Sequence, residues 1–149
     1  MKIYLAADHQ GFHFKEKIFA YLSKHGYDVE DVGDQVLDPD DDFPQFAYAA
    51  TTKVIGSEDD DPRAILLCGG GQGMAMAANR IQGIRAAVIW DAHEARMTRY
   101  DNDSNVLSLP ARVLQDKDEV WQGILETWLN TKFAGAPRFV RRNKQLDEF

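Results

Sequence analysis

Cysteine is nearly absent from this sequence: Cys68 is the only one among 149 residues. A single cysteine cannot form a disulfide within the chain, and without cysteine companions it cannot build a cysteine-based zinc site. Proteins without disulfides are typical of reducing compartments, so we expect a cytoplasmic protein.

An excess of positive charge and long apolar runs are absent as well. The 24 acidic and 17 basic residues give a formal net charge of −7, whereas nucleic acids and anionic membranes favour basic partners. No apolar run approaches membrane-spanning length, and segment 1–8 meets charge too early for a signal peptide. We therefore expect neither nucleic acid nor a membrane as a partner.

What the sequence does contain is a regular alternation of strand and helix patterns. Its length and its 44% hydrophobic residues suffice for the core of one domain over 1–149. The segments predicted as strands are 2–7, 27–33, 64–68, 83–89 and 105–109. The segments predicted as helices are 12–25, 43–54, 74–80, 92–100 and 116–130. This order predicts an α/β three-layer sandwich with a mainly parallel, five-stranded sheet.

The stretch from Ala64 to Met74 is the most informative part of the chain. Its apolar run suits a strand buried on both faces, and it ends in Cys68 and a glycine cluster that leads into a helix. Such a loop presents backbone N–H groups to an anionic or oxyanionic ligand, and Cys68 at its start would act as a base or nucleophile. In the alternative interpretation, Cys68 is an inert core residue and the glycines only form the turn.

Polar residues follow four of the predicted strands, and ligands of parallel α/β folds bind beyond the carboxyl ends of strands. We therefore expect these residues to converge; they are Asp8 and His9, Cys68 with its glycines, Asp91, and Arg112. The basic tail contains Arg138, Arg141 and Arg142, which could clamp a phosphate or simply solvate the surface.

A further set of segments is informative when taken together and in order: 7–12, 42–44, 67–74, 77–79, 83–86, 102–107, 112, 128–129 and 133–135. Together they resemble the RpiB/LacA/LacB sugar-phosphate isomerases over nearly the whole chain. The resemblance implies a Rossmann-like fold with a C-terminal helical tail, no metal and no cofactor. It also implies a homodimer, possibly pairing into a tetramer, with active sites at the interface. The tail, about 131–149, is then expected to pack on the partner subunit.

The resemblance further implies aldose–ketose isomerisation of a phosphorylated sugar, such as ribose 5-phosphate or another pentose or hexose phosphate. Cys68 would be the base that moves a proton between C1 and C2 through an enediolate. The developing oxyanion would be stabilised by the N–H groups of the loop, which comprises Gly69, Gly70, Gly71, Gln72 and Gly73.

The same resemblance assigns the remaining substrate contacts. Asp8 and His9 would hold sugar hydroxyls or the ring oxygen, and Asn102 would bind substrate. Arg112 and Arg141 match phosphate-binding arginines, expected from opposite subunits.

Several positions depart from the family pattern, and all of them are positions where the resemblance implies contact with the substrate. Asp101 stands where the family has the histidine that opens the sugar ring. An aspartate is a poor proton donor at neutral pH unless burial raises its pKa. Asp101 is therefore a candidate catalytic residue, and otherwise ring opening is impaired or falls to His9. Gly70 and Phe43 each replace a hydroxyl-bearing residue. Pro137 removes an arginine, which Arg138 could replace.

These departures leave other functions open. The chain could be a weakened homologue that binds a sugar phosphate without turnover, or an isomerase of a different or unphosphorylated aldose. Nucleotide binding fits less well, because Gly69, Gly71 and Gly73 do not follow the dinucleotide-binding spacing and no Walker loop is present.

Overall fold

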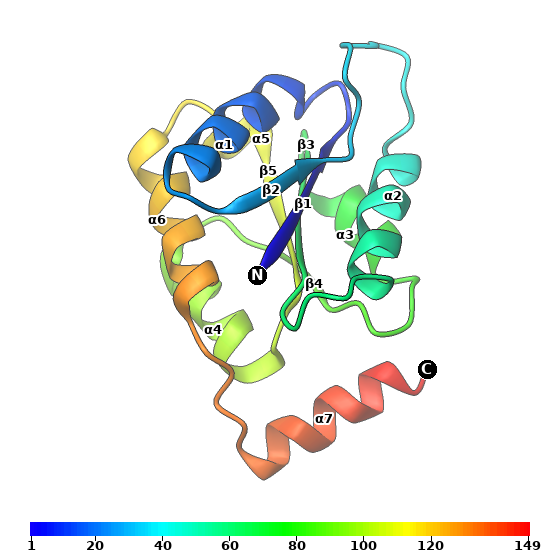
Figure 1. Cartoon of the computed structure of the whole chain (residues 1–149), viewed down its shortest axis with the longest axis vertical. Coiled ribbons are helices and arrows are strands. Elements are labelled where there is room, and N and C mark those ends of the chain that lie inside the picture. The colour runs from blue at the N-terminus through cyan, green and yellow to red at the C-terminus, as the bar shows by residue number, and fades with distance from the viewer.

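The computed structural model describes all 149 residues, and its centre is a five-stranded sheet (Figure 1). The strands are β1 (Lys2–Ala7), β2 (Asp28–Asp31), β3 (Arg63–Cys68), β4 (Ala86–Val88) and β5 (Val106–Pro110). Their order in the sheet is β2-β1-β3-β5-β4, and every neighbouring pair is parallel. The predicted α/β class and the parallel sheet are thus confirmed.

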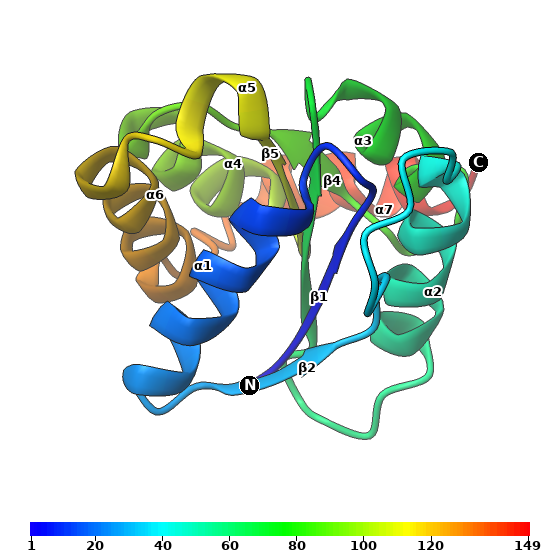
Figure 2. The same cartoon turned by 90° about the horizontal axis from the view of Figure 1, so that it is seen from above.

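Helices cover both faces of this sheet, as the view from above shows (Figure 2). One face carries α1 (Phe12–Lys24), α4 (Ala92–Asn102), α5 (Ala111–Leu114) and α6 (Asp118–Asn130); the other carries α2 (Phe43–Ile55) and α3 (Gln72–Ala78). Each face has its own hydrophobic core. The result is the predicted three-layer arrangement.

The central strand β3 is buried along its whole length, which explains its unalternated apolar sequence. Ile65 and Leu67 enter the core under α1 and α6, whereas Ala64, Leu66 and Cys68 enter the core under α2 and α3. Cys68 therefore ends the strand on the face that α3 covers, at the carboxyl edge of the sheet.

The edge strands are shorter than the sequence predicts. β4 contains three residues instead of the predicted 83–89, because a turn with Gly83 at φ 83° precedes it. Two amides hold this turn: Asn105 Nδ2 donates to the Gly83 carbonyl at 2.8 Å, and Asn79 Nδ2 donates to the Ala86 carbonyl at 2.9 Å. The short helix α5 was not predicted, since four residues are too few to show a helical period.

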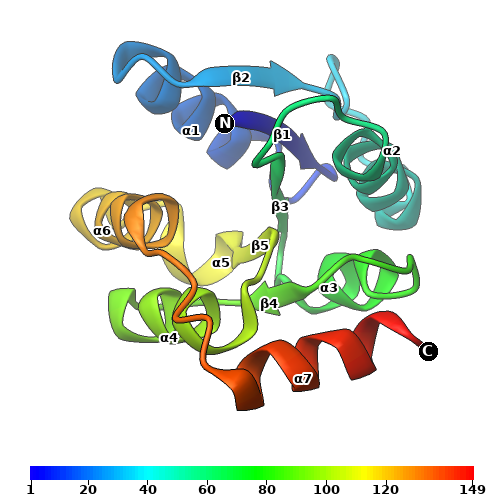
Figure 3. The same ribbon diagram turned by 60° about the horizontal axis from the view of Figure 1, so that its bottom comes forward.

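The C-terminal helix α7 (Pro137–Asp147) lies alongside the edge strand β4 (Figure 3). It rests on α4 through the rings of Tyr100 and Phe139, whose centroids are 6.4 Å apart, and Arg85 forms an ion pair with Asp147 at 2.9 Å. Its outer face is poorly covered, since Val140 and Leu146 are each about half exposed. No helix of the chain is long and apolar enough to cross a membrane.

Candidate active site

Asp8 and Cys68 lie side by side at the carboxyl edge of the sheet. The register pairs Ala7 with Leu67, and the Asp8 N–H donates to the Leu67 carbonyl at 3.2 Å. The buried Asp8 carboxylate accepts the N–H groups of Gln10 and Gly11 at 2.9 and 3.1 Å. Burial raises the pKa of Asp8 above its usual value, although these hydrogen bonds oppose the shift.

His9 follows Asp8 and is held by a carboxylate from the acidic loop before α2. Its Nδ1 lies 2.6 Å from Asp41 Oδ1, and its backbone N–H donates to the same oxygen at 3.1 Å. The Asp41 side chain is only 2% exposed, whereas that of His9 is 30% exposed. The hydrogen bond to Asp41 is the main cause that raises the pKa of His9, with further contributions from nearby carboxylates.

The glycine loop curls back over Cys68. The Gly71 N–H donates to Cys68 Sγ at 3.2 Å, and Ser108 Oγ fixes the loop by donating to the Gly71 carbonyl at 2.6 Å. The N–H groups of Gly69 and Gly70 donate to no other group of the chain. The loop therefore presents free backbone donors within reach of the thiol.

Arg112 from α5 lies against the same loop. Its N–H donates to the Gly69 carbonyl at 3.0 Å, and its Nη1 donates to Gln10 Oε1 at 3.1 Å. A Cβ at Gly70 would lie 2.9 Å from Arg112 Nη2, so only the absence of a side chain lets the guanidinium approach this closely. The Phe43 ring covers Gly73 in the same way, because a Cβ there would lie 2.8 Å from the ring.

The structure thus places one set of predicted site residues together, which we call the carboxyl-edge group: Asp8, His9, Cys68, Gly69, Gly70, Gly71, Gln72, Gly73 and Arg112. Asp91 follows β4 at the same edge, where it caps α4 by accepting the Glu94 N–H at 2.8 Å. That contact assigns Asp91 a role in starting a helix.

The other predicted residues lie at the opposite edge of the sheet. Helix α4 starts beyond the carboxyl end of β4 and returns to the amino end of β5, so Asp101 and Asn102 lie at the amino edge. The Asn102 carbonyl accepts from Arg85 Nε at 3.0 Å, just before β4. Arg138 and Arg141 are exposed on α7, which packs against the end of α4 through Phe139 and Tyr100. We call these four the amino-edge group: Asp101, Asn102, Arg138 and Arg141.

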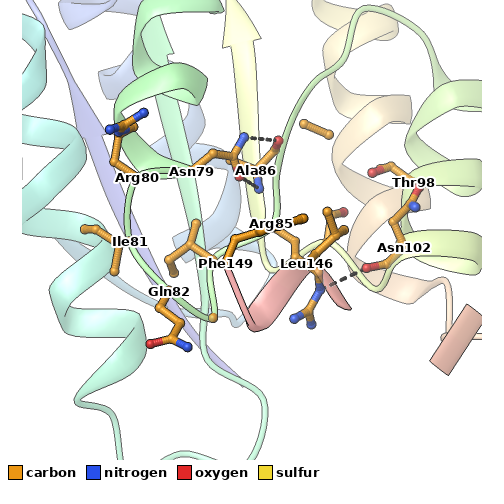
Figure 4. Close-up of a pocket in the computed structure, with 14 residues that line it drawn as sticks. Asn79, Arg80, Ile81, Gln82, Arg85, Ala86, Thr98, Asn102, Leu146 and Phe149 are labelled. Carbon is orange, nitrogen blue, oxygen red and sulfur yellow. Dashed lines mark hydrogen bonds between the residues drawn. The ribbon is translucent and has the colours of Figure 1, made fainter. Parts of the chain in front are cut away.

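A cavity of about 370 Å³ also opens at the amino edge, between β4, the end of α4 and the end of α7 (Figure 4). Asn102, Arg85 and Leu146 are among its lining residues. Of the predicted site residues only Asn102 lines it, so the cavity is separate from Cys68 and the glycine loop.

Sequence reasoning did not assign a role to Gln10 or Asp41. Asp41 meets His9 across 32 positions, and it sits in an acidic loop without any periodic pattern. No signal in the sequence distinguishes it from its neighbours Asp40 and Asp42. Gln10 could have been predicted as a site residue, because it directly follows Asp8 and His9 in the sequence.

Asp8, His9 and Asp41 are also the one group whose spacing could accept a cation, since their potential ligand atoms lie within 4.8 Å of one another. His9 Nδ1 and Asp41 Oδ1 are hydrogen-bonded to each other, and Asp8 Oδ1 accepts two backbone N–H groups. These hydrogen bonds account for the cluster as a carboxylate–imidazole pair beside a second carboxylate.

Replacing Gly71 by alanine is expected to destabilise the fold by about 2 to 3 kcal/mol, from left-handed backbone strain plus crowding. The residue has φ 71°, and a Cβ would lie 3.2 Å from both the Pro110 nitrogen and Val88 Cγ1. Gly26 is the matched control, because it has φ 80° with nothing near its Cβ position. We expect Gly26→Ala to cost only about 1 kcal/mol in urea denaturation. Equal losses would contradict the role of crowding.

Known proteins resemble this chain over its full length. The model of the ribose/galactose isomerase family matches residues 3–146. Ribose-5-phosphate isomerase B of Mycolicibacterium paratuberculosis is 34% identical over 149 residues, which cover all of this chain and 91% of that protein. The structure of a ribose 5-phosphate isomerase from Thermotoga maritima is 40% identical with a TM-score of 0.92, covering 99% of this chain and 98% of that one.

A third match is the structure of ribose-5-phosphate isomerase B from Mycoplasma genitalium with bound ribulose-5-phosphate. It is 32% identical with a TM-score of 0.89, and the match covers 99% of this chain and 94% of that chain. A family model that spans nearly the whole chain, together with relatives above 30% identity, identifies the family. The chain therefore belongs to the ribose/galactose isomerase family, RpiB/LacA/LacB, and is an aldose–ketose isomerase.

Proposed function

We propose that this chain interconverts ribose 5-phosphate and ribulose 5-phosphate, or a related aldose and ketose phosphate, with Cys68 as the base. The single observation that carries the proposal is the position of the Cys68 thiol at the carboxyl edge, under a loop with free N–H donors and between Asp8 and Arg112. The relatives named above act on or bind these same sugars, which supports the choice of substrate.

In the proposed reaction, the Cys68 thiolate removes the proton from C2 of the open-chain aldose. The electrons of that C–H bond form the C1–C2 double bond, and the negative charge moves to O1. The N–H groups of Gly69 and Gly70 stabilise this oxyanion, which is the contribution that usually matters most. The Cys68 thiol then returns a proton to C1, and the O2 proton moves to O1 as the C2 carbonyl forms, which completes the ketose. The Gly71 N–H, which donates to Cys68 Sγ at 3.2 Å, holds the sulfur against the loop.

The proposed active site needs two copies of the chain. The carboxyl-edge and amino-edge groups lie at opposite ends of the same sheet, so one chain cannot apply both to one sugar. In a twofold homodimer, the amino edge of each subunit can meet the carboxyl edge of the other, which creates two equivalent sites. The half-exposed Val140 and Leu146 on α7 supply apolar surface for such an interface.

Turnover in deuterated water tests the function directly. We expect the wild-type protein to isomerise ribose 5-phosphate and to incorporate solvent deuterium at C2, as NMR would show. Turnover of hexose 6-phosphates, measured in the same way, shows which sugar length the protein prefers. Binding of these sugars without exchange or turnover would refute catalysis and indicate a protein that only binds sugar phosphates.

Arg141→Ala is expected to raise KM for ribose 5-phosphate about 10- to 100-fold, the loss typical of a charge-assisted hydrogen bond to phosphate. Arg142→Ala is the matched control, since Arg142 is a neighbouring exposed arginine that the family resemblance does not match to phosphate binding, and its KM should stay within about 2-fold. Arg138→Ala tests whether Arg138 replaces the arginine missing at Pro137. An unchanged KM in Arg141→Ala would refute phosphate recognition by α7.

A further inference from the structure

The pair formed by His9 and Asp41 is built as an oriented acid within the carboxyl-edge group. Asp41 accepts both the ring Nδ1 and the backbone N–H of His9, which fixes the imidazole against the loop. His9 Nε2 has no partner in the chain, and the ring keeps 30% of its surface exposed. The free nitrogen is thus available to a ligand beside Asp8 and Cys68.

The chemistry of the two groups assigns the protons of this pair. An ionised carboxylate only accepts hydrogen bonds, so the Nδ1 of His9 carries a proton. The Asp41 side chain is almost completely buried, and its Oδ2 has no partner. A buried carboxylate that lacks full hydrogen bonding is stabilised by a positive neighbour, which favours imidazolium over neutral imidazole at His9.

The loop that supplies Asp41 is anchored from beneath. Lys15 is buried on α1, where its Nζ donates to the Asp34 carbonyl and pairs with Asp31 Oδ2 at 2.8 Å. Further along, the Asp41 N–H donates to the Asp38 carbonyl at 3.2 Å. Lys15 thus fixes the start of the loop, and the turn from Asp38 to Asp41 positions the carboxylate that contacts His9.

The charged groups that face His9 are the carboxylates of Asp8, Asp38 and Asp41, while the cation Arg112 contacts the adjacent Gln10. By contrast, Asp101 forms no hydrogen bond or ion pair through its side chain and lies at the other edge of the sheet. Within its own chain Asp101 thus has no partner that orients it, whereas His9 has Asp41.

We propose that His9, oriented by Asp41, is the acid that opens the sugar ring in this protein; this rests on the proposed isomerase function. In the step, His9 Nε2 gives its proton to the ring oxygen O4 of the furanose as the C1–O4 bond breaks. The anomeric hydroxyl gives its proton to the Asp8 carboxylate, and the C1–O1 carbonyl forms. Transfer of that proton from Asp8 back to His9 through solvent restores both groups. Asp41 keeps the Nδ1 proton and is a positioning residue.

Two substrates separate ring opening from enolisation. Ribose 5-phosphate is a furanose and must open before Cys68 can act. Ribulose 5-phosphate carries its phosphate on the C5 oxygen, so it cannot close a five-membered ring onto its C2 carbonyl and is already open. Exchange of its C1 proton with deuterated water therefore reports enolisation alone.

We expect His9→Gln to lower isomerisation of ribose 5-phosphate about 100-fold at pH 7, the usual contribution of an acid catalyst, and Asp41→Asn to lower it about 10-fold. Exchange at C1 of ribulose 5-phosphate should stay within about 3-fold of wild type in Asp41→Asn. In both variants, the rate with ribose 5-phosphate should stop rising with enzyme concentration once spontaneous opening limits it. Asp40→Asn, an exposed neighbour in the loop, is the matched control and should change neither reaction.

The pH dependence of the rate distinguishes a catalytic role of the His9–Asp41 pair from a purely structural one, because a structural role would leave the pH profile unchanged. The pKa of His9 is raised by Asp41, so the active imidazolium persists below that raised pKa and is lost as pH rises through it. The alkaline limb for ribose 5-phosphate should therefore move to lower pH in Asp41→Asn. The profile for C1 exchange of ribulose 5-phosphate should not move with it.

The outcomes separate this proposal from the proposed function. A wild-type protein that fails to exchange the C1 proton of ribulose 5-phosphate would refute the isomerase function itself. With the wild type active, equal losses of both reactions in Asp41→Asn would overturn the ring-opening role, as would full retention of both. Equal thermal midpoints of Asp41→Asn and Asp40→Asn exclude unfolding as the cause of a loss.

Discussion

Cys68→Ala is expected to lower kcat for ribose 5-phosphate by at least about 1000-fold, within the range reported for removal of a general base. Deuterium exchange at C2 should vanish with turnover, because no other thiol in the chain can take the proton. Binding should survive, since Asp8, Arg112 and the glycine loop remain. The measurement is single-turnover isomerisation together with NMR of the recovered sugar.

The alternative interpretation, in which Cys68 is only a core residue, gives a different result. Cys68 belongs to the hydrophobic core under α2 and α3 and is 6% exposed. A merely structural cysteine would show a modest loss of stability in Cys68→Ala and nearly normal activity. Such a result would refute the base assignment.

Val106→Ala is the matched control for this experiment. Val106 is fully buried in the same core but lies at the start of β5, at the other end of the sheet. We expect it to lower the free energy of unfolding by about 1 to 3 kcal/mol while turnover stays close to wild type. The contrast separates loss of packing from loss of the base.

Two inactive variants are expected to regain activity when their subunits exchange. Cys68→Ala damages the carboxyl-edge group, and the double variant Asn102→Ala/Arg141→Ala damages the amino-edge group. In a mixed dimer, one site carries both defects and the other carries none. With random exchange, half of the dimers are mixed, so recovery should reach about a quarter of wild-type activity.

The complementation also tests the oligomeric state. A monomer, or a dimer whose sites each lie within one subunit, would show no recovery at any mixing ratio. As a control, mixing Cys68→Ala with Gly71→Ala should restore little, because both changes damage the carboxyl-edge group. Sedimentation of the wild-type protein would show whether its dimers pair further.

The sequence by itself determined the main frame of this protein. The unalternated run before Cys68 predicted a strand buried on both faces, and β3 is buried throughout. The alternation of strands and helices predicted the parallel sheet, because parallel strands need crossover helices. These features are local patterns, repeated along the chain, and local patterns can be read without the fold.

The local patterns also placed Asp8 with Cys68, because both end neighbouring strands of a parallel sheet. They placed Gly71 in the turn, where its φ of 71° suits glycine. The edge strand β4 was overestimated, because the sequence does not show that Asn79 and Asn105 hold Gly83 in a turn.

Only the tertiary structure decided how the site residues are divided. Whether the last residue of α4 reaches the amino edge depends on the length and direction of that helix. The sequence alone therefore could not predict that Asp101 and Asn102 lie at the opposite edge of the sheet from Cys68. The pairing of His9 with Asp41 depends on the course of an acidic loop that has no period. Contacts between residues far apart in sequence arise from packing, and packing is settled only when the whole chain has folded.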